Sequence, residues 1–284
     1  MAQTFPSLVS TAWLAENSDM PGLVVLDASR HLPAAGRDPL AEYEAGHIPG
    51  ARFLDLASLT DTASPVPAAI PDAQQLAERL ASLGIRLGDR IVLYDDSALK
   101  TSARAWFTLI AHGVESVAVL DGGLKKWRDE GRALEQGAAQ INIVAPYTLA
   151  DTKRVASKAA ILHGLDQDEQ ILDARAADRV FGSGIDPVHG GQNGRIPGSR
   201  NVPFGDVFAP DGTYKTPEDL RSTFEAAGVE LGRPVTTSCG SGITASVLLF
   251  ALHLAGHDNT RLYDGSWQEW EADPDTPKEQ GPAS

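Results

Sequence analysis

Cys239 is the only cysteine of the chain, and its surroundings are those of a reactive thiol. A strand-like stretch precedes it, a helix-like run follows, and the loop between them reads Thr237-Ser238-Cys239-Gly240-Ser241-Gly242-Ile243-Thr244-Ala245. A lone cysteine is commonly a small buried hydrophobe. Two glycines and two hydroxyl residues within five positions, however, are poorly suited to wrapping a core residue. We therefore interpret Cys239 as a nucleophile.

The predicted loop favours negative charge on sulfur. The thiolate is the reactive form of cysteine, and a helix N-terminus carries partial positive charge and unpaired N–H groups. Gly240 and Gly242 permit a backbone that turns successive N–H groups inward, while Ser241 and Thr244 can add hydroxyl donors. The same groups would stabilise a Cys239 persulfide after delivery of a sulfur atom.

Two other thiol chemistries fit this loop poorly. A phosphatase loop follows the Cys-x5-Arg register, and here that register places Ala245 where the arginine should be. No Arg or Lys lies between Cys239 and His253, so phosphate-ester chemistry is disfavoured. Nothing near Cys239 resembles the local signature of papain-like thiol proteases.

Composition narrows the function classes further. The chain has 284 residues, of which 42% are hydrophobic and 22% charged, as in a soluble globular protein of one large or two medium domains. The net charge of −14 argues against nucleic acid and anionic membrane surfaces as partners. No apolar run approaches the roughly 18 residues of a membrane span, and no secretory signal is visible at the start.

One cysteine suits a reducing compartment and rules out an intrachain disulfide or a cysteine-rich metal site. We expect a cytoplasmic protein without metal or cofactor.

The chain repeats itself once. Three blocks recur in the same order: 24–30 with 170–175, 46–51 with 194–199, and 119–123 with 262–266. Their nearly constant offset predicts a duplicated domain of roughly 140 residues, an ordinary domain size. The pattern weakens between residues 136 and 154, so we expect one domain over 1–140 and a second over 155–284.

The two copies differ at the position of the cysteine, where Asp95 of the first copy aligns with Cys239. Because a carboxylate cannot carry sulfane sulfur, the first copy is expected to be catalytically silent.

Short apolar strands alternate with helical patterns in both copies. We predict strands over 23–27, 90–94, 116–120, 171–173, 235–238 and 260–263, and helices over 73–83, 102–112, 124–130, 217–227 and 243–255. This alternation is typical of parallel α/β layers, in which sites form at the carboxyl ends of strands. Cys239 lies at such an end. Pro274, Pro277 and Pro282 predict a poorly ordered tail from Asp273.

These blocks resemble the tandem-domain rhodanese-type sulfurtransferases over about 9–270, nearly the whole chain. The resemblance implies two rhodanese-like domains, each with a central, mainly parallel sheet flanked by helices. Within that family the loop Cys-Gly-Ser-Gly-Val-Thr-Ala belongs to the 3-mercaptopyruvate sulfurtransferases, and the loop here differs only by Ile243. The thiosulfate enzymes typically carry a basic residue in the loop, which suits a dianionic donor.

The resemblance also implies a mechanism. Cys239 attacks the sulfur of 3-mercaptopyruvate, pyruvate leaves as its enolate, and a small thiol, a redox protein or cyanide removes sulfur from the resulting persulfide. Covalent catalysis of this kind divides one transfer into two easier steps. Two alternatives stay open at this point: thiosulfate as the donor with the same persulfide, and a persulfide-carrier protein that serves a protein partner.

Family positions outside the loop are matched only in part. The arginine that grips the donor carboxylate maps to Arg179, where a bidentate contact is expected. A second arginine, nine positions later in the family, is replaced by Val188, which leaves His189 or Arg195 as candidates for its place. An Asp and a His proposed in the family to relay protons with the loop serine, here Ser241, correspond to Ala57 and Ala68.

Overall fold

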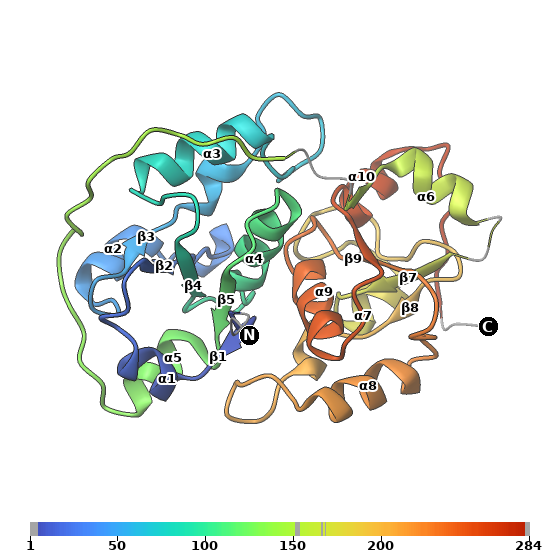
Figure 1. The fold of residues 1–284 in the computed structure, drawn as a ribbon. Coiled ribbons are helices and arrows are strands. Elements are labelled where there is room, and N and C mark those ends of the chain that lie inside the picture. The colour runs from blue at the N-terminus through green and yellow to red at the C-terminus, as the bar shows by residue number, and fades with distance from the viewer. Residues whose placement is uncertain (1–4, 151–153, 166, 168, 282–284) are drawn as a thin grey trace. The chain divides into compact units, whose positions relative to one another are not determined.

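Two five-stranded sheets form the framework of the chain, and each is the centre of one compact unit (Figure 1). The computed structural model describes residues 5–150, 154–165, 167 and 169–281. The first sheet contains β1 (Leu8–Val9), β2 (Leu23–Asp27), β3 (Arg52–Phe53), β4 (Arg90–Tyr94) and β5 (Val117–Leu120). The second contains β6 (Val155–Ala156), β7 (Gln170–Asp173), β8 (Arg200–Asn201), β9 (Val235–Ser238) and β10 (Thr260–Tyr263).

Both sheets have the same topology. The strand order is β1-β5-β4-β2-β3 in the first and β6-β10-β9-β7-β8 in the second, and every described pair is parallel. Parallel sheets need helical connections that cover both faces, so their central strands are buried and apolar. The α/β class and the duplication predicted from the sequence are therefore confirmed. The limits at 140 and 155 stay predictions, and residues 1–4 and 282–284 of the two ranges lie outside the described residues.

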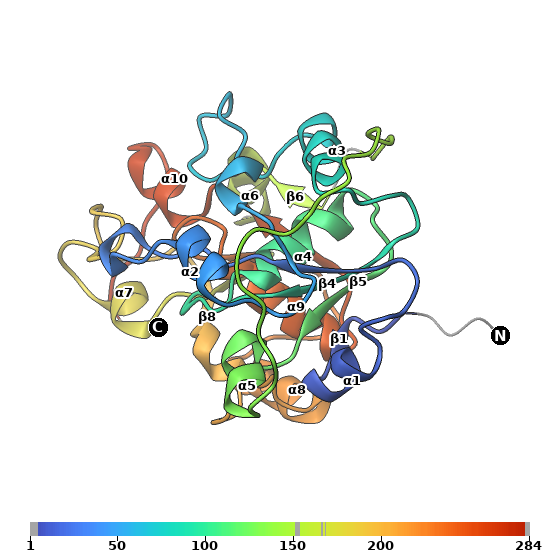
Figure 2. The same ribbon diagram turned by 90° about the vertical axis from the view of Figure 1, so that its left-hand side faces the viewer.

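Helices and short 3-10 turns connect the strands. The first half contains α1 (Thr11–Glu16), η1 (Pro33–Ala35), α2 (Pro39–Ala45), η2 (Leu56–Leu59), α3 (Ala73–Ser82), α4 (Ser102–Ala111) and α5 (Gly123–Asp129). The second contains α6 (Lys158–Leu165), α7 (Ala177–Phe181), η3 (Phe204–Val207), α8 (Pro217–Ala226), α9 (Ala245–Leu254) and α10 (Ser266–Ala272). Helix α4 packs on β4 and β5, and α9 packs on β9 and β10. Helices α1 and α5 lie side by side in both views (Figure 1 and Figure 2). Among the described helices, none is long and apolar enough to cross a membrane.

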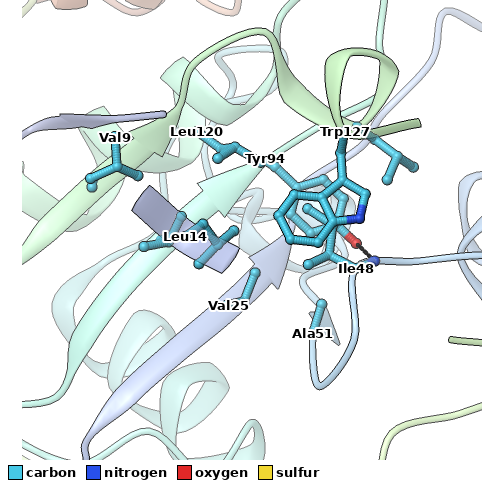
Figure 3. Packing of buried hydrophobic residues seen from close by; sticks show 11 residues of the cluster. Val9, Leu14, Val25, Ile48, Ala51, Tyr94, Leu120 and Trp127 are labelled. Carbon is cyan, nitrogen blue, oxygen red and sulfur yellow. Dashed lines mark hydrogen bonds between the residues drawn. The ribbon is translucent and has the colours of Figure 1, made fainter. Parts of the chain in front are cut away.

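The core of the first unit packs against one face of its sheet (Figure 3). Val25, Tyr94 and Leu120 come from neighbouring strands and meet Trp127 of α5. The Tyr94 hydroxyl accepts a hydrogen bond from the Ile48 N–H at 3.4 Å, which satisfies a polar group inside the apolar cluster. The second unit has a matching cluster that includes Ile171, Tyr263, Trp267 and Trp270. The tryptophans of α5 and α10 are core residues.

A tight turn joins β5 to α5 and fixes the loop after β4. Gly123 has φ of 61°, and an added Cβ would lie 2.5 Å from the Asp95 carbonyl oxygen. The Leu124 N–H donates to that same oxygen at 3.1 Å. Glycine is required here both by the left-handed backbone and by the close approach of the Asp95 carbonyl.

The substitution Gly123→Ala is expected to destabilise the first unit more than Gly50→Ala does. Gly50 also has a left-handed φ, of 75°, but nothing lies within 4 Å of its Cβ position. Both variants carry the backbone strain, on the order of 1–3 kcal/mol, and only Gly123→Ala adds the overlap with Asp95. Urea unfolding of the two variants measures the difference. Equal losses would show that the close approach is not what requires Gly123.

Candidate active site

Cys239 directly follows the central strand of the second sheet. Strand β9 lies between β10 and β7, and all four of its residues are buried. Helix α9 begins at Ala245, two residues later than the apolar pattern predicts, with Thr244 as its N-cap residue. Gly242 has φ of 79°, a left-handed conformation that turns the chain between Cys239 and the helix. The strand, loop and helix predicted around the thiol are therefore present.

Helix α10 fixes the backbone of the cysteine loop. The Cys239 N–H donates to Ser266 Oγ at 3.0 Å, and the Cys239 carbonyl accepts from the Trp267 N–H at 2.9 Å. The Gly240 carbonyl accepts from the Gln268 N–H at 3.0 Å. Ser266 is fully buried, and its hydroxyl in turn donates to the Tyr263 carbonyl. Cys239 itself is 2% exposed, so the thiol belongs to a rigid, largely enclosed loop.

Sequence reasoning missed Ser266. Its backbone is left-handed, with φ of 52°, which is unusual for a residue other than glycine. The repeat offers a signal, because Asp264-Gly265-Ser266 matches Asp121-Gly122-Gly123 and only the second copy has a side chain at the third position. In the second copy the Ser266 hydroxyl accepts a hydrogen bond from the Cys239 N–H. A glycine at this position, as in the first copy, has no side chain that could accept such a bond.

Several backbone N–H groups of the loop around Cys239 have no partner in the part of the chain that the structure describes. Among the described residues, the N–H groups of Gly240, Ser241, Ile243, Thr244 and Ala245 donate no hydrogen bond. The Ser241 and Thr244 hydroxyls are likewise without a partner in the part of the chain that the structure describes. Such a set of donors at a helix N-terminus is suited to an anion.

The first copy shows what such a loop binds. There the Asp95 carboxylate accepts the Ser97 N–H at 2.9 Å and the Ser102 N–H, the first of α4, at 2.8 Å. The corresponding donors of the second copy are the N–H groups of Ser241, two residues after the cysteine, and of Ala245, the first residue of α9. The first loop is thus occupied by its own anion, whereas the second leaves its donors for an anion carried by Cys239.

Arg179 lies in a buried network of two arginines and two aspartates. Its Nε donates to both oxygens of Asp186 at 3.1 Å and its Nη2 to Oδ2 at 2.7 Å. Arg175 is fully buried, binds Asp173 through Nε and Nη2, and lies 3.7 Å from Asp186. Asp186 therefore holds Arg179 by one edge of the guanidinium. The other edge, between Nη1 and Nη2, takes no part in this pair, and the side chain is 15% exposed.

Asp186 is a residue that sequence reasoning missed. It also accepts the backbone N–H groups of Val188 at 2.8 Å and of His189 at 3.2 Å. Burial alone would raise the pKa of its carboxyl, but the hydrogen bonds from Arg179 and Val188 and the charge of Arg179 lower that pKa below its usual range. The available signal was the Asp186-Pro187 pair, which is typical of a turn that an aspartate caps.

His189 lies against the cysteine loop. A Cβ added to Gly240 would overlap Nε2 and Cδ2 of the His189 ring, so a larger residue at position 240 would force the ring to move. The ring is half-buried, and burial followed by the charge of Arg179 lowers the pKa of His189 below its ordinary 6.5. The structure thus places His189 next to the loop of Cys239, and it places Arg179 near enough to His189 for its charge to act on the imidazole.

Arg195 is held by the C-terminal segment instead. Its side chain forms an ion pair with Glu279 at 3.0 Å, donates to the Gly281 carbonyl, and stacks on Phe181 at 5.1 Å. The prediction of a poorly ordered tail is wrong for 273–281, because Thr276 is buried and the Trp270 Nε1–H donates to the Pro277 carbonyl. Residues 282–284 lie outside the described residues. Tertiary hydrogen bonds override the proline pattern here.

The geometry of the site suits covalent thiol chemistry. Within the described ranges, no three His, Cys, Asp or Glu side chains stand together in a way that could hold a metal ion. A single thiol at the end of a central parallel strand, in a loop of unpaired N–H groups, is the arrangement expected of an α/β enzyme with a cysteine nucleophile.

Comparisons with known proteins identify the family. The chain matches the Rhodanese-like domain family over residues 10–130 and again over 157–273. It is 37% identical over 275 residues to 3-mercaptopyruvate sulfurtransferase of Mus musculus, covering 94% of this chain and 93% of the relative. It is 36% identical over 274 residues to the enzyme of that name from Escherichia coli (strain K12), covering 95% and 97%. Thiosulfate sulfurtransferase of Cricetulus griseus is 35% identical over 98% of this chain and 96% of that relative.

A solved structure agrees with these relatives. The crystal structure of SseA from Escherichia coli, described as a rhodanese fold of 3-mercaptopyruvate sulfotransferases, superimposes with a TM-score of 0.83. It has 35% sequence identity and covers 92% of this chain and 98% of that one. The chain belongs to the rhodanese-like family, contains two such domains, and is a sulfurtransferase. The resemblance seen in the repeated blocks is confirmed.

Proposed function

We propose that the chain moves sulfane sulfur from 3-mercaptopyruvate, through a persulfide on Cys239, to a thiol or to cyanide. The observation that carries this proposal is the pair of equivalent loops, one filled by the Asp95 carboxylate and one with its donors free around Cys239. The first domain is silent in this scheme, because Asp95 stands where the nucleophile would be. Its role is structural.

The loop acts where negative charge develops. As the Cys239 thiolate attacks the donor sulfur, charge moves to the outer sulfur of the persulfide and to the leaving enolate. Backbone N–H groups already aligned by strand β9 and helix α9 stabilise such charge without reorganising during the reaction. Arg179 binds the donor carboxylate through its free Nη1–Nη2 edge, because Asp186 occupies the Nε–Nη2 edge.

The lack of a cation in the cysteine loop supports mercaptopyruvate over thiosulfate. Position 240 is a glycine, and no Arg or Lys lies between Cys239 and His253. Mercaptopyruvate has one carboxylate, for which one arginine suffices, whereas the thiosulfate dianion favours a second cation close to the sulfur. Thiosulfate remains the second candidate donor, because one relative with that activity in its name is 35% identical.

The acceptor is a reduced thiol of a small molecule or a redox protein. Persulfide discharge to a thiol requires acceptor thiols that stay reduced, which is the condition of the cytoplasm. We place the reaction there. In a carrier role, the Cys239 persulfide would pass only to a docked protein and would turn over slowly with small thiols.

Incubation with 3-mercaptopyruvate should add one sulfur atom to the intact protein, and added thiol should remove it. The variant Cys239→Ser should gain no mass and should show no transfer to cyanide, because its hydroxyl cannot carry sulfane sulfur. Intact-mass spectrometry before and after thiol treatment makes the measurement. A wild-type protein that gains no sulfur, or a variant that keeps transferring it, would contradict the assignment of Cys239.

Turnover with the two donors should favour mercaptopyruvate. With cyanide as acceptor, we expect kcat/KM for 3-mercaptopyruvate to exceed that for thiosulfate by at least about tenfold, the effect of roughly 1.4 kcal/mol. Thiocyanate formation at matched donor concentrations measures both. Faster transfer from thiosulfate would make this protein a thiosulfate sulfurtransferase. Slow transfer to every small acceptor would favour the carrier role.

The substitution Arg179→Lys should raise KM for 3-mercaptopyruvate about tenfold or more. Lysine keeps the charge that compensates buried Asp186 but loses the forked contact to the carboxylate, and hydrogen bonds to charged groups contribute about 1.5–3 kcal/mol. Arg221→Lys, at an exposed position on α8, is the matched control and should leave KM unchanged. An unaltered KM in Arg179→Lys would remove Arg179 from substrate binding.

A further inference from the structure

We propose that His189 is a catalytic residue of the sulfur-loading step, where its Nε2 accepts the thiol proton of 3-mercaptopyruvate and returns it to the methylene carbon of the leaving enolate. This role rests on the proposed function, because it requires a donor whose leaving group is a carbanion equivalent. The proposed role differs from that of a second residue that binds the donor carboxylate, because a neutral imidazole adds no positive charge to the site.

A short turn positions the ring at the loop. Asp186 accepts the His189 N–H at 3.2 Å, and the Gly190 N–H donates back to the Asp186 carbonyl at 2.9 Å. This turn presents the imidazole edge that carries Nε2 to the backbone of Gly240, the residue directly after Cys239. Gly240 allows the ring to approach because it has no side chain. The imidazole therefore lies against the residue that directly follows Cys239, within the loop that a donor would approach.

The ring nitrogens of His189 are free for a ligand. In the described portion of the chain, neither nitrogen has a hydrogen-bond partner, although the side chain is half-buried. Two other buried histidines contrast with it: His47 and His112 each bind the carbonyl four residues earlier through Nδ1, both at 2.8 Å. His257 is buried with its Nε2 unpaired as well, so what distinguishes His189 is that its free ring also lies beside Gly240 of the cysteine loop.

The charges around the ring keep it neutral at rest. Burial and the charge of Arg179 lower the pKa of His189, with a further lowering by Arg175, while Asp186 acts in the opposite direction. The fourth group nearby is the Cys239 thiol of the loop. A neutral imidazole is the form that can act as a base first, and the same cations favour release of the proton afterwards.

The proton and electron balance closes without another reactant. The Cys239 thiolate forms a bond to the donor sulfur while the carbon–sulfur bond breaks, and that electron pair passes to the carbon as the enolate of pyruvate. Nε2 takes the proton of the donor thiol, which leaves the persulfide as an anion in the N–H loop. The imidazolium then protonates the enolate carbon, so pyruvate leaves and His189 is neutral again.

The variant His189→Gln separates proton transfer from the rest of the site. In single-turnover experiments, loading of Cys239 from 3-mercaptopyruvate should slow by about 100-fold or more, the range of general acid–base catalysis. Discharge of the persulfide to cyanide, after loading with inorganic polysulfide, should change by less than about twofold, because no carbon is protonated in that step. His163→Gln, at an exposed position on α6, is the matched control and should change neither step.

Two further readouts distinguish catalysis from packing. In the wild type, loading from 3-mercaptopyruvate should fall as the pH decreases through the lowered pKa of His189, since only neutral imidazole accepts the proton. Loading from polysulfide, which needs no such base, should lack that decrease and should report Cys239 alone. His189→Gly should regain part of its loading rate when free imidazole is added.

The outcomes separate this proposal from the proposed function. Equal slowing of loading and discharge in His189→Gln, or unchanged loading, would overturn the catalytic role of His189 while a wild-type Cys239 adduct still supported the sulfurtransferase. A wild-type protein that gains no sulfur from 3-mercaptopyruvate would overturn both. Slowing confined to loading, with the pH dependence lost and imidazole rescue present, is the expected result.

Discussion

The buried carboxylate of Asp186 is the constraint on which the rest of the site depends. It binds Arg179, lies beside Arg175, and accepts the backbone N–H groups that fix the turn to His189. Removing one member of such a buried set leaves an uncompensated charge, which costs on the order of 3–5 kcal/mol. One side chain therefore sets both the edge that Arg179 offers to a carboxylate and the place of the imidazole beside Gly240.

The duplication shows how one backbone serves two purposes. In both copies, the first turn of the last helix binds the carbonyl of the residue at the nucleophile position, through Leu124 to Asp95 and through Trp267 to Cys239. The first copy then closes its loop with its own carboxylate, and a glycine suffices at position 123. The second copy has Cys239 in place of that carboxylate, and the extra hydrogen bond from the Cys239 N–H to Ser266 holds the backbone that an aspartate would otherwise stabilise.

The sequence predicts the long central elements well and the short peripheral ones poorly. Strands β2, β4, β9 and β10 have the predicted limits, because most of their residues are apolar or β-branched, which suits a buried parallel strand. Strands β1, β3, β6 and β8 have two residues each and leave no readable pattern. At the site, the thiol and its glycine loop are local features. Asp186 and Ser266 act through partners that the fold brings together; the Asp186-Pro187 turn and the repeat mark the two positions, but neither pattern reveals those partners.

The charges of the site separate binding from catalysis. Arg175, Arg179, Asp173 and Asp186 cancel, so the network binds a carboxylate through the directed edge of Arg179 more than through net charge. That contact is the same before and during sulfur transfer, and uniform binding of this kind lowers KM without raising kcat. The N–H groups of the loop stabilise negative charge that develops only as the carbon–sulfur bond breaks. Stabilising charge in the transition state, and not before it, is what raises the reaction rate. A full cation at position 240 would strengthen binding of the donor and its product alike. Gly240 instead leaves room for the neutral imidazole of His189. This ring can accept a proton and release it again as the charge moves during the reaction.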